Sequence, residues 1–263
     1  MDLGIKDKVA LITAASQGLG KAVAWRLSLE GARVVICSRS LDKLTKAADE
    51  IVADAGGNVR TIACNVTDEN QVKGMVDHIV GEFGRLDILV CNAGGPPAGT
   101  AEDFELDDYR KALELNLLST INLCNLAIPV MKKNKWGRII GMTSVSVKQP
   151  IDNLILSNTA RTGVTGYLKT LSNQVAHFGI TVNSVCPGYT RTQRVENLAK
   201  AFAESGKGTI KDFYDKLEKD IPMKRLGTPE EFAQVVAFLT SQGAGYITGV
   251  SLQVDGGYIK GLF

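Results

Sequence analysis

The sequence predicts an α/β fold: a single doubly wound, Rossmann-type domain with a seven-stranded parallel sheet and helices on both faces. Short apolar runs alternate with longer segments of helical periodicity along the whole chain. The runs are apolar throughout rather than at every second residue, which is typical of strands buried on both faces. No linker interrupts this pattern in 263 residues, so we expect residues 1–263 to form one domain.

Each element follows from the order of these segments. The predicted strands are the apolar runs 8–13, 33–37, 59–64, 86–91, 138–142, 180–186 and 250–254. The predicted helices are the periodic segments 21–30, 41–54, 68–83, 105–134, 157–178 and 229–241. Strands that alternate with helices form parallel sheets, because each helix carries the chain back to the start of the next strand.

Composition excludes several classes of protein. A net charge of +2 gives no sign of nucleic-acid binding, and no apolar run approaches the ~20 residues that span a bilayer. The first residues lack the apolar core of a signal peptide, so we expect a cytoplasmic protein that binds no membrane. Five cysteines without a C-x-x-C pair and only two histidines indicate no disulfide framework and no metal site.

A glycine-containing turn, T-A-A-S-Q-G-L-G, follows the first strand and leads into a helix. Gly18 and Gly20 would let the backbone approach a phosphate, and the helix N-terminus offers free N–H groups. The turn therefore predicts a phosphate cradle, although many strand-to-helix turns carry two glycines.

Hydroxyl side chains cluster where the fifth strand stops, at Thr143, Ser144 and Ser146. Ligands of open α/β sheets bind at the carboxyl ends of strands, so this is a natural place for chemistry. An obvious proton donor is missing there, because Ser157 is a poor acid and the Arg161 guanidinium keeps its proton.

Six motifs in order resemble the short-chain dehydrogenase/reductase family, of the kind that includes 3-oxoacyl-carrier-protein reductases. They are the turn from Thr13, N-A-G from Asn92, Asn116 within a helix, Ser144, P-G from Pro187 and D-G-G from Asp255. This resemblance covers nearly the whole chain. It implies hydride transfer between a nicotinamide and a carbonyl or alcohol, with a small-molecule or acyl substrate.

The residues after the second strand predict NADP(H) rather than NAD(H). An acid there would bind the ribose 2′-hydroxyl, but Ser38 and Arg39 suit a 2′-phosphate instead. The alternative is that Arg39 faces solvent beside Asp42. Ala14 replaces the family's first glycine, which is tolerable if φ is negative there. The expected cofactor-binding residues are Thr13, Ala15, Ser16, Gly18, Leu19, Gly20, Ser38, Arg39, Asn65, Val66, Asn92, Ala93, Gly94, Arg161, Pro187, Gly188 and Thr190.

In the family a Ser, a Tyr and a Lys four residues later carry out catalysis, with an Asn supporting a water relay. Ser144 and Asn116 match this pattern. The helix from Ser157 resembles the family's Tyr-bearing helix, and its 13-residue separation from Ser144 is the family's own. We therefore expect Ser157 in place of the Tyr and Arg161 in place of the Lys.

The altered relay leaves the proton donor open. Lys148 and Tyr189 are candidate donors, although the first could be an exposed loop lysine and the second a packing residue. We expect an NADP(H)-dependent oxidoreductase with an atypical proton relay. The alternatives are a catalytically impaired NADP(H)-binding sensor or subunit, and other chemistry such as epimerisation or dehydration.

Two further segments carry expectations from the resemblance. Residues 189–225 correspond to a mobile substrate lid, and their mild excess of Lys and Arg could favour an acidic substrate. A solvated helical hairpin is the alternative interpretation. The run from Tyr246 to Gly257 resembles the segment through which family members pair, which implies a homotetramer or homodimer.

Overall fold

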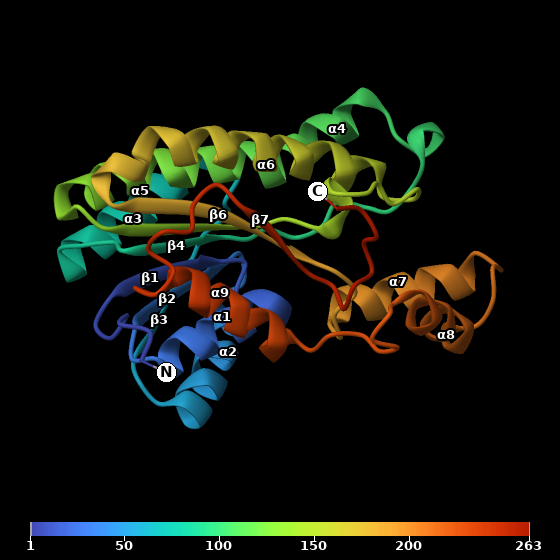
Figure 1. Ribbon diagram of the computed structural model, residues 1–263, viewed down its shortest axis with the longest axis horizontal. Helices are drawn as coiled ribbons and strands as arrows, with labels where there is room; N and C mark the ends of the chain where they lie inside the picture. Colours follow the sequence, from blue (N-terminus) through green and yellow to red (C-terminus); the bar gives the residue numbers. More distant parts are fainter. Residues whose placement is uncertain (1, 263) are drawn as a thin grey trace.

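Seven parallel strands form one sheet in the order β3-β2-β1-β4-β5-β6-β7, in a computed structural model that describes residues 2–262 (Figure 1). The strands are β1 Val9–Thr13, β2 Arg33–Ser38, β3 Val59–Ala63, β4 Ile88–Cys91, β5 Gly137–Met142, β6 Ile180–Pro187 and β7 Ser251–Val254. From β1 the chain builds outward to β3 and then returns to place β4 on the other side of β1. This reversal opens a crevice at the carboxyl ends of β1 and β4, where such sheets bind ligands.

Helices cover both faces of the sheet, as the sequence predicts. They are α1 Gly18–Leu29, α2 Leu41–Ala55, α3 Glu69–Phe83, α4 Leu106–Leu113, α5 Ser119–Asn134, α6 Ile155–Val175, α7 Gln193–Glu204, α8 Ile210–Asp220 and α9 Pro229–Thr240. Figure 1 shows α1, α2 and α9 on one face, and α3, α5 and α6 on the other. Alternate residues of β1 enter the two cores: Ala10 and Ile12 pack toward α1, whereas Val9 and Leu11 pack toward α3. The doubly wound fold predicted from the sequence is confirmed.

One helical stretch, Leu106–Asn134, is long and apolar enough to cross a membrane by length and composition alone. It consists of α4, a π-helical turn at Glu114–Leu118, and α5. Polar and charged residues interrupt this stretch, so it contains no long apolar run and the sequence alone does not single it out. Leu123, Ala127 and Met131 of α5 lie fully within the core beneath the sheet. One side of α5 thus packs into the core of the domain.

Helix α6 lies unusually close to β5. A Cβ atom added at Gly141 of β5 would lie 2.3 Å from Leu168 Cδ1 of α6, far inside van der Waals contact. All six residues of β5 are buried. The glycine therefore sets how α6, which carries Ser157 and Arg161, sits against the strand that ends at Ser144.

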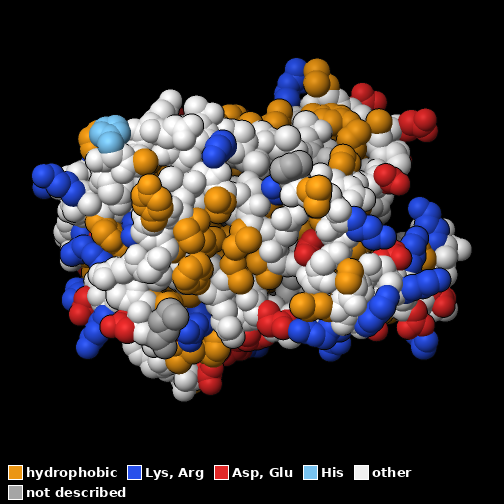
Figure 2. Space-filling model, viewed as in Figure 1, with side chains coloured by type: hydrophobic (Ala, Val, Ile, Leu, Met, Phe, Trp, Pro, Cys, Tyr) orange, Lys and Arg blue, Asp and Glu red, His pale blue; other side chains and the backbone are white. Residues whose placement is uncertain are grey.

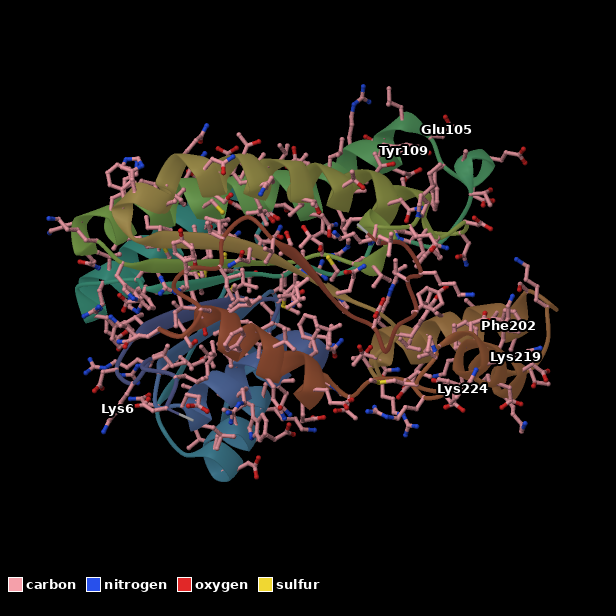
Figure 3. All side chains as sticks on the ribbon, viewed as in Figure 1. Lys6, Glu105, Tyr109, Phe202, Lys219 and Lys224 are labelled. Carbon is pink, nitrogen blue, oxygen red and sulfur yellow. The ribbon has the colours of Figure 1, made fainter. Side chains whose placement is uncertain are left out.

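Helices α7 and α8 form a hairpin within the predicted lid segment, and Figure 1 shows it beyond the end of the sheet. It has a small apolar cluster of its own, formed by Val195, Leu217, Ile221 and Leu226. Basic and acidic side chains are interspersed over its outer surface (Figure 2). Figure 3 labels Phe202, Lys219 and Lys224 there. The hairpin matches the alternative interpretation of this segment, whereas its role as a lid stays a prediction.

Candidate active site

A cavity of about 700 Å³ lies at the carboxyl ends of the strands. This volume falls within the range of small-molecule sites. Its walls come from the turn after β1, the residues that follow β2 through β6, and helix α7. Among the expected cofactor-binding residues, those that line it are Ser16, Gly18, Leu19, Gly20, Ser38, Arg39, Asn65, Val66, Asn92, Ala93, Gly94, Arg161, Pro187, Gly188 and Thr190. Thr13 and Ala15 lie behind this wall and are fully buried.

The glycine turn after β1 has the close backbone approach that a phosphate cradle requires. A Cβ at Gly20 would lie 2.7 Å from Ala14 O and 2.8 Å from Asn92 Nδ2, so only glycine fits there. Gly18 opens α1 with a φ of 58°. Ala14 has a φ of 48°, so the negative φ assumed for this alanine is wrong. The backbone of Ala14 therefore lies in the left-handed region, which costs an L-residue about 1 to 2 kcal/mol.

The N-A-G turn after β4 is fastened to the end of β1. Thr13 Oγ1 donates to Asn92 O at 2.6 Å and accepts from Asn92 N at 2.8 Å. Asn92 Nδ2 donates to Ala14 O at 3.2 Å. Thr13 thus supports the cavity floor by holding the two strand ends together, which explains why it need not line the cavity itself.

Basic and hydroxyl side chains meet at the cavity end formed by β2 and α2. Ser38, Arg39, Ser40 and Lys43 line this end, and Arg39 is exposed to solvent there. Ser40 caps α2 by accepting from Lys43 N, which places Lys43 on the first turn of the helix beside Arg39. This pair of cations suits a phosphate on the adenosine ribose. Lys43 was not among the predicted site residues; a signal was available in its position three residues after an N-cap serine.

Ser144 follows the end of β5 and lines the cavity. Its Oγ accepts a hydrogen bond from Ser146 N at 3.1 Å. A hydroxyl has one proton, and an Oγ that accepts from the backbone keeps that proton free to donate elsewhere. Ser144 can therefore donate its proton to an acceptor in the cavity.

Asn116 lies in the π-helical turn between α4 and α5 and is 3% exposed. Its Nδ2 donates to Ala112 O at 3.3 Å, while its Oδ1 is buried and has no hydrogen-bond partner among residues 2–262. It stands behind the cavity wall, whereas its neighbour Leu115 lines the cavity. An unpaired buried carbonyl of this kind is a suitable acceptor for a bound water.

Ser157 and Arg161 lie one turn apart on α6 and both line the cavity. Arg161 Nε donates to Ser157 Oγ at 3.2 Å, so Ser157, like Ser144, keeps its proton for an acceptor in the cavity. Arg161 Nη1 donates to Met142 O at 2.8 Å and to Thr143 O at 3.0 Å, at the end of β5. The guanidinium therefore joins the helix that carries Ser157 to the strand that leads to Ser144.

The charge of Arg161 is held in an unusual environment. The residue is 9% exposed, and burial, together with the positive charge of Arg194, lowers its pKa to about 10. It remains charged at neutral pH. All four of its hydrogen-bond acceptors are neutral, the fourth being Ala93 O at 3.4 Å.

The two candidate proton donors differ in position. Tyr189 lines the cavity, but its ring packs edge-on against Tyr258, 5.4 Å between centroids. Burial, and then Tyr258, raise the Tyr189 pKa above its usual value, so its phenol releases a proton less readily. Lys148 is half-buried on the short helical turn after Ser144 and lies outside the cavity lining. The geometry favours neither residue over the Ser157 hydroxyl.

Comparisons with known proteins bear on the chain as a whole. The chain matches the family model described as "Enoyl-(Acyl carrier protein) reductase" over residues 13–259. The 3-oxoacyl-[acyl-carrier-protein] reductase FabG of Thermotoga maritima is 33% identical over 97% of this chain and 99% of its own length. The NADPH-dependent reductase BacG of Bacillus subtilis is 30% identical over 98% of this chain and all of its own.

A solved structure gives the same result. L-sorbose reductase from Gluconobacter frateurii, complexed with NADPH and L-sorbose, superposes with a TM-score of 0.94 and 32% identity over the full length of both chains. These relatives are oxidoreductases. Similarity at this identity and over this length shows that the chain belongs to the short-chain dehydrogenase/reductase family.

Proposed function

We propose that this protein is an NADP(H)-dependent oxidoreductase that interconverts a carbonyl and an alcohol, as 3-oxoacyl reductases do, with Ser157 and Arg161 in place of the family's Tyr and Lys. One observation carries the proposal. Ser144 and Ser157 both line the cavity, and each Oγ accepts an N–H from the protein, so each keeps its own proton available for an acceptor there. Two such donors can hold a carbonyl oxygen and stabilise the negative charge that develops on it.

The cofactor assignment rests on the fit of the residues present. The N-terminal turn of α1, from Gly18 to Gly20, lines the cavity and offers backbone N–H groups that suit a pyrophosphate, and Ser38, Arg39 and Lys43 suit a 2′-phosphate. The NADPH that accompanies L-sorbose reductase and the NADPH dependence of BacG support the same cofactor. Bound NADP(H) would supply or accept the hydride.

In the reducing direction the chain's own groups handle the substrate oxygen. Ser144 and Ser157 donate hydrogen bonds to it. Arg161 Nε donates to Ser157 Oγ, which makes the Ser157 hydroxyl a stronger hydrogen-bond donor. The positive charge of Arg161 has no anionic partner among its described contacts, and it also stabilises the negative charge of the alkoxide that forms. The alkoxide then takes a proton from water in the cavity, directly or through Ser157. The fixed charge of Arg161 thus replaces part of the stabilisation of the substrate oxygen that an acidic phenol would give.

The test measures cofactor binding and turnover separately and compares the two. NADPH binding is measured by fluorescence, and NADPH oxidation is then followed across a panel of ketones, aldehydes and oxo acids. We expect binding together with oxidation of at least one class of carbonyl. Tight binding with no oxidation of any compound would instead support a catalytically impaired NADP(H)-binding sensor or subunit.

The double variant Ser157→Tyr with Arg161→Lys complements this test, because it restores the residues that the family uses. A large rise in turnover would show that the native site is impaired. Unchanged or lower turnover is expected if Ser157 and Arg161 form a working site of their own.

A further inference from the structure

The charged residues that line the cavity all have the same sign. They are Arg39, Lys43, Arg161 and Arg194, and no Asp or Glu is present among the described lining residues. The chain as a whole is nearly balanced, with 30 Lys and Arg against 28 Asp and Glu. The positive cavity is therefore a local feature, which suits anionic ligands.

The four cations form two pairs. Arg39 and Lys43 stand at the ends of β2 and α2, whereas Arg161 is anchored to the end of β5. Because β2 and β5 are separated by β1 and β4, the two pairs stand about 14 Å apart at the usual strand spacing. Arg39 and Lys43 lie where an adenosine phosphate would bind. Arg161 and Arg194 lie at the end with Ser144 and Ser157.

Arg161 and Arg194 hold the loop after β4 from two sides. Arg161 Nη2 donates to Ala93 O at 3.4 Å, and Arg194 Nη2 donates to Pro96 O at 2.9 Å. The two guanidiniums are near enough for the charge of Arg194 to disfavour that of Arg161. Like charges placed close together cost free energy unless an anion joins them.

Neither guanidinium has a carboxylate partner within residues 2–262. Arg161 donates to backbone carbonyls and to Ser157, whereas Arg194 has one hydrogen bond within the described part of the chain, to Pro96 O, and its other N–H groups have no acceptor there. Arg194 comes from the first turn of α7 and stays partly exposed. It is therefore placed to bind an anion that enters beside the two serines.

We infer that the substrate carries a carboxylate, which Arg194 binds through its free N–H groups while the substrate's carbonyl or alcohol oxygen meets Ser144 and Ser157. This inference rests on the proposed function and names its substrate class: an oxo acid and its hydroxy acid. Reduction adds a hydride to the carbonyl carbon and a proton from water to its oxygen, and the carboxylate is unchanged. The aliphatic side chains of Leu115, Ile151, Leu154 and Leu198 also line the cavity and would contact the substrate's carbon skeleton.

The experiment compares matched substrates. The panel holds 2-oxohexanoate and 4-oxocyclohexanecarboxylate, each with its neutral methyl ester. We expect the protein to prefer the acids. We also expect Arg194→Leu to raise KM for an acid about 10- to 100-fold, the range for a charge-assisted contact, with little change for the ester. Arg194→Lys should recover part of the loss.

Arg191→Leu is the matched control. Arg191 is exposed, lies three residues earlier in the same segment, and is outside the cavity lining. It should leave the KM of acids and esters unchanged. NADPH affinity is measured for each variant, because an arginine that instead served the cofactor's pyrophosphate would weaken NADPH binding equally with every substrate. That result, or a preference for the esters, would overturn the inference.

Binding is measured separately from turnover, by titrating each acid and ester into protein saturated with NADP⁺. Acid binding that depends on Arg194 supports the inference even if no compound is turned over, in which case the proposed function is what fails. Equal binding of acid and ester would overturn the inference whether or not turnover is seen.

Discussion

Replacing Ser157 by alanine removes one of the two hydroxyls that we assign to the substrate oxygen. Ser157 is 6% exposed, and its Oγ accepts from Arg161 Nε at 3.2 Å. Loss of one donor to a developing oxyanion costs about 2.7 to 4 kcal/mol of transition-state stabilisation, or about 10²- to 10³-fold in kcat. We expect a kcat lower by that factor.

The same change has a second effect on stability. It leaves Arg161 Nε buried without its acceptor, and an unsatisfied buried donor costs about 1 to 3 kcal/mol. Because this loss alone could lower the amount of folded enzyme, kcat is measured by single-turnover NADPH oxidation at saturating substrate, with the active fraction determined by NADPH binding.

Ser146→Ala provides a control with the same chemical change. Ser146 is 2% exposed, its Oγ has no hydrogen-bond partner, and it is outside the cavity lining. Its backbone N–H still donates to Ser144 Oγ after the substitution. We expect kcat within twofold of the unaltered protein. If Ser157→Ala also kept kcat within twofold, the role given to Ser157 would be wrong.

Four other perturbations test separate features. Ala14→Gly should stabilise the protein by about 1 kcal/mol, because it relieves a φ of 48°, and raise Tm by about 2 to 4 °C in a thermal melt; a lower Tm would contradict the strain. Arg39→Gln together with Lys43→Gln should raise KM for NADPH at least 10-fold and leave KM for NADH nearly unchanged; an equal loss for both would show that neither side chain meets the 2′-phosphate. Since burial lowers the Arg161 pKa to about 10, the folded protein should lose this proton before the unfolded chain does. The charge of Arg161 therefore disfavours folding below pH ~10, and this penalty is relieved at higher pH. The kcat/KM should fall above pH ~10, because the cation is lost there. A kcat/KM that is independent of pH from 9 to 11 would exclude a role for the charge. Leu252→Lys, at one of the exposed apolar residues Phe238, Tyr246, Val250 and Leu252 of the C-terminal segment, should lower the mass measured by light scattering if this chain forms the expected homodimer or homotetramer; an unchanged oligomer would place the contact elsewhere.

The seven strands and most helix limits could be read from the sequence because burial on both faces leaves a continuous apolar signal. β5 begins at Gly137, one residue before the predicted start, and α6 begins at Ile155, two residues before. The φ of Ala14 could not be predicted, since the composition of a turn does not specify its backbone angles. A single alanine there is equally compatible with a strained turn.

Side-chain positions were predicted less well than elements. Lys148 and Asn116 are near the site in sequence, yet both lie outside the described cavity lining because the direction of a side chain depends on the turn that carries it. Arg194 was visible only as one of several basic residues in the lid segment. Its position beside the cavity depends on a hydrogen bond to Pro96 O, 98 residues away in the chain, which no local sequence pattern predicts.

The contact of Gly141 with Leu168 has a consequence for the timing of catalysis. A Cβ at Gly141 would lie 2.3 Å from Leu168 Cδ1, so any larger residue there would push helix α6 away from β5. Arg161 joins the same two elements by hydrogen bonds to Met142 O and Thr143 O. The two serine hydroxyls are thus brought into register when the chain folds, before any substrate arrives. Arg194 comes from α7, outside this joined pair of elements, so the residue that we propose binds the substrate carboxylate and the two serines are carried by different parts of the molecule.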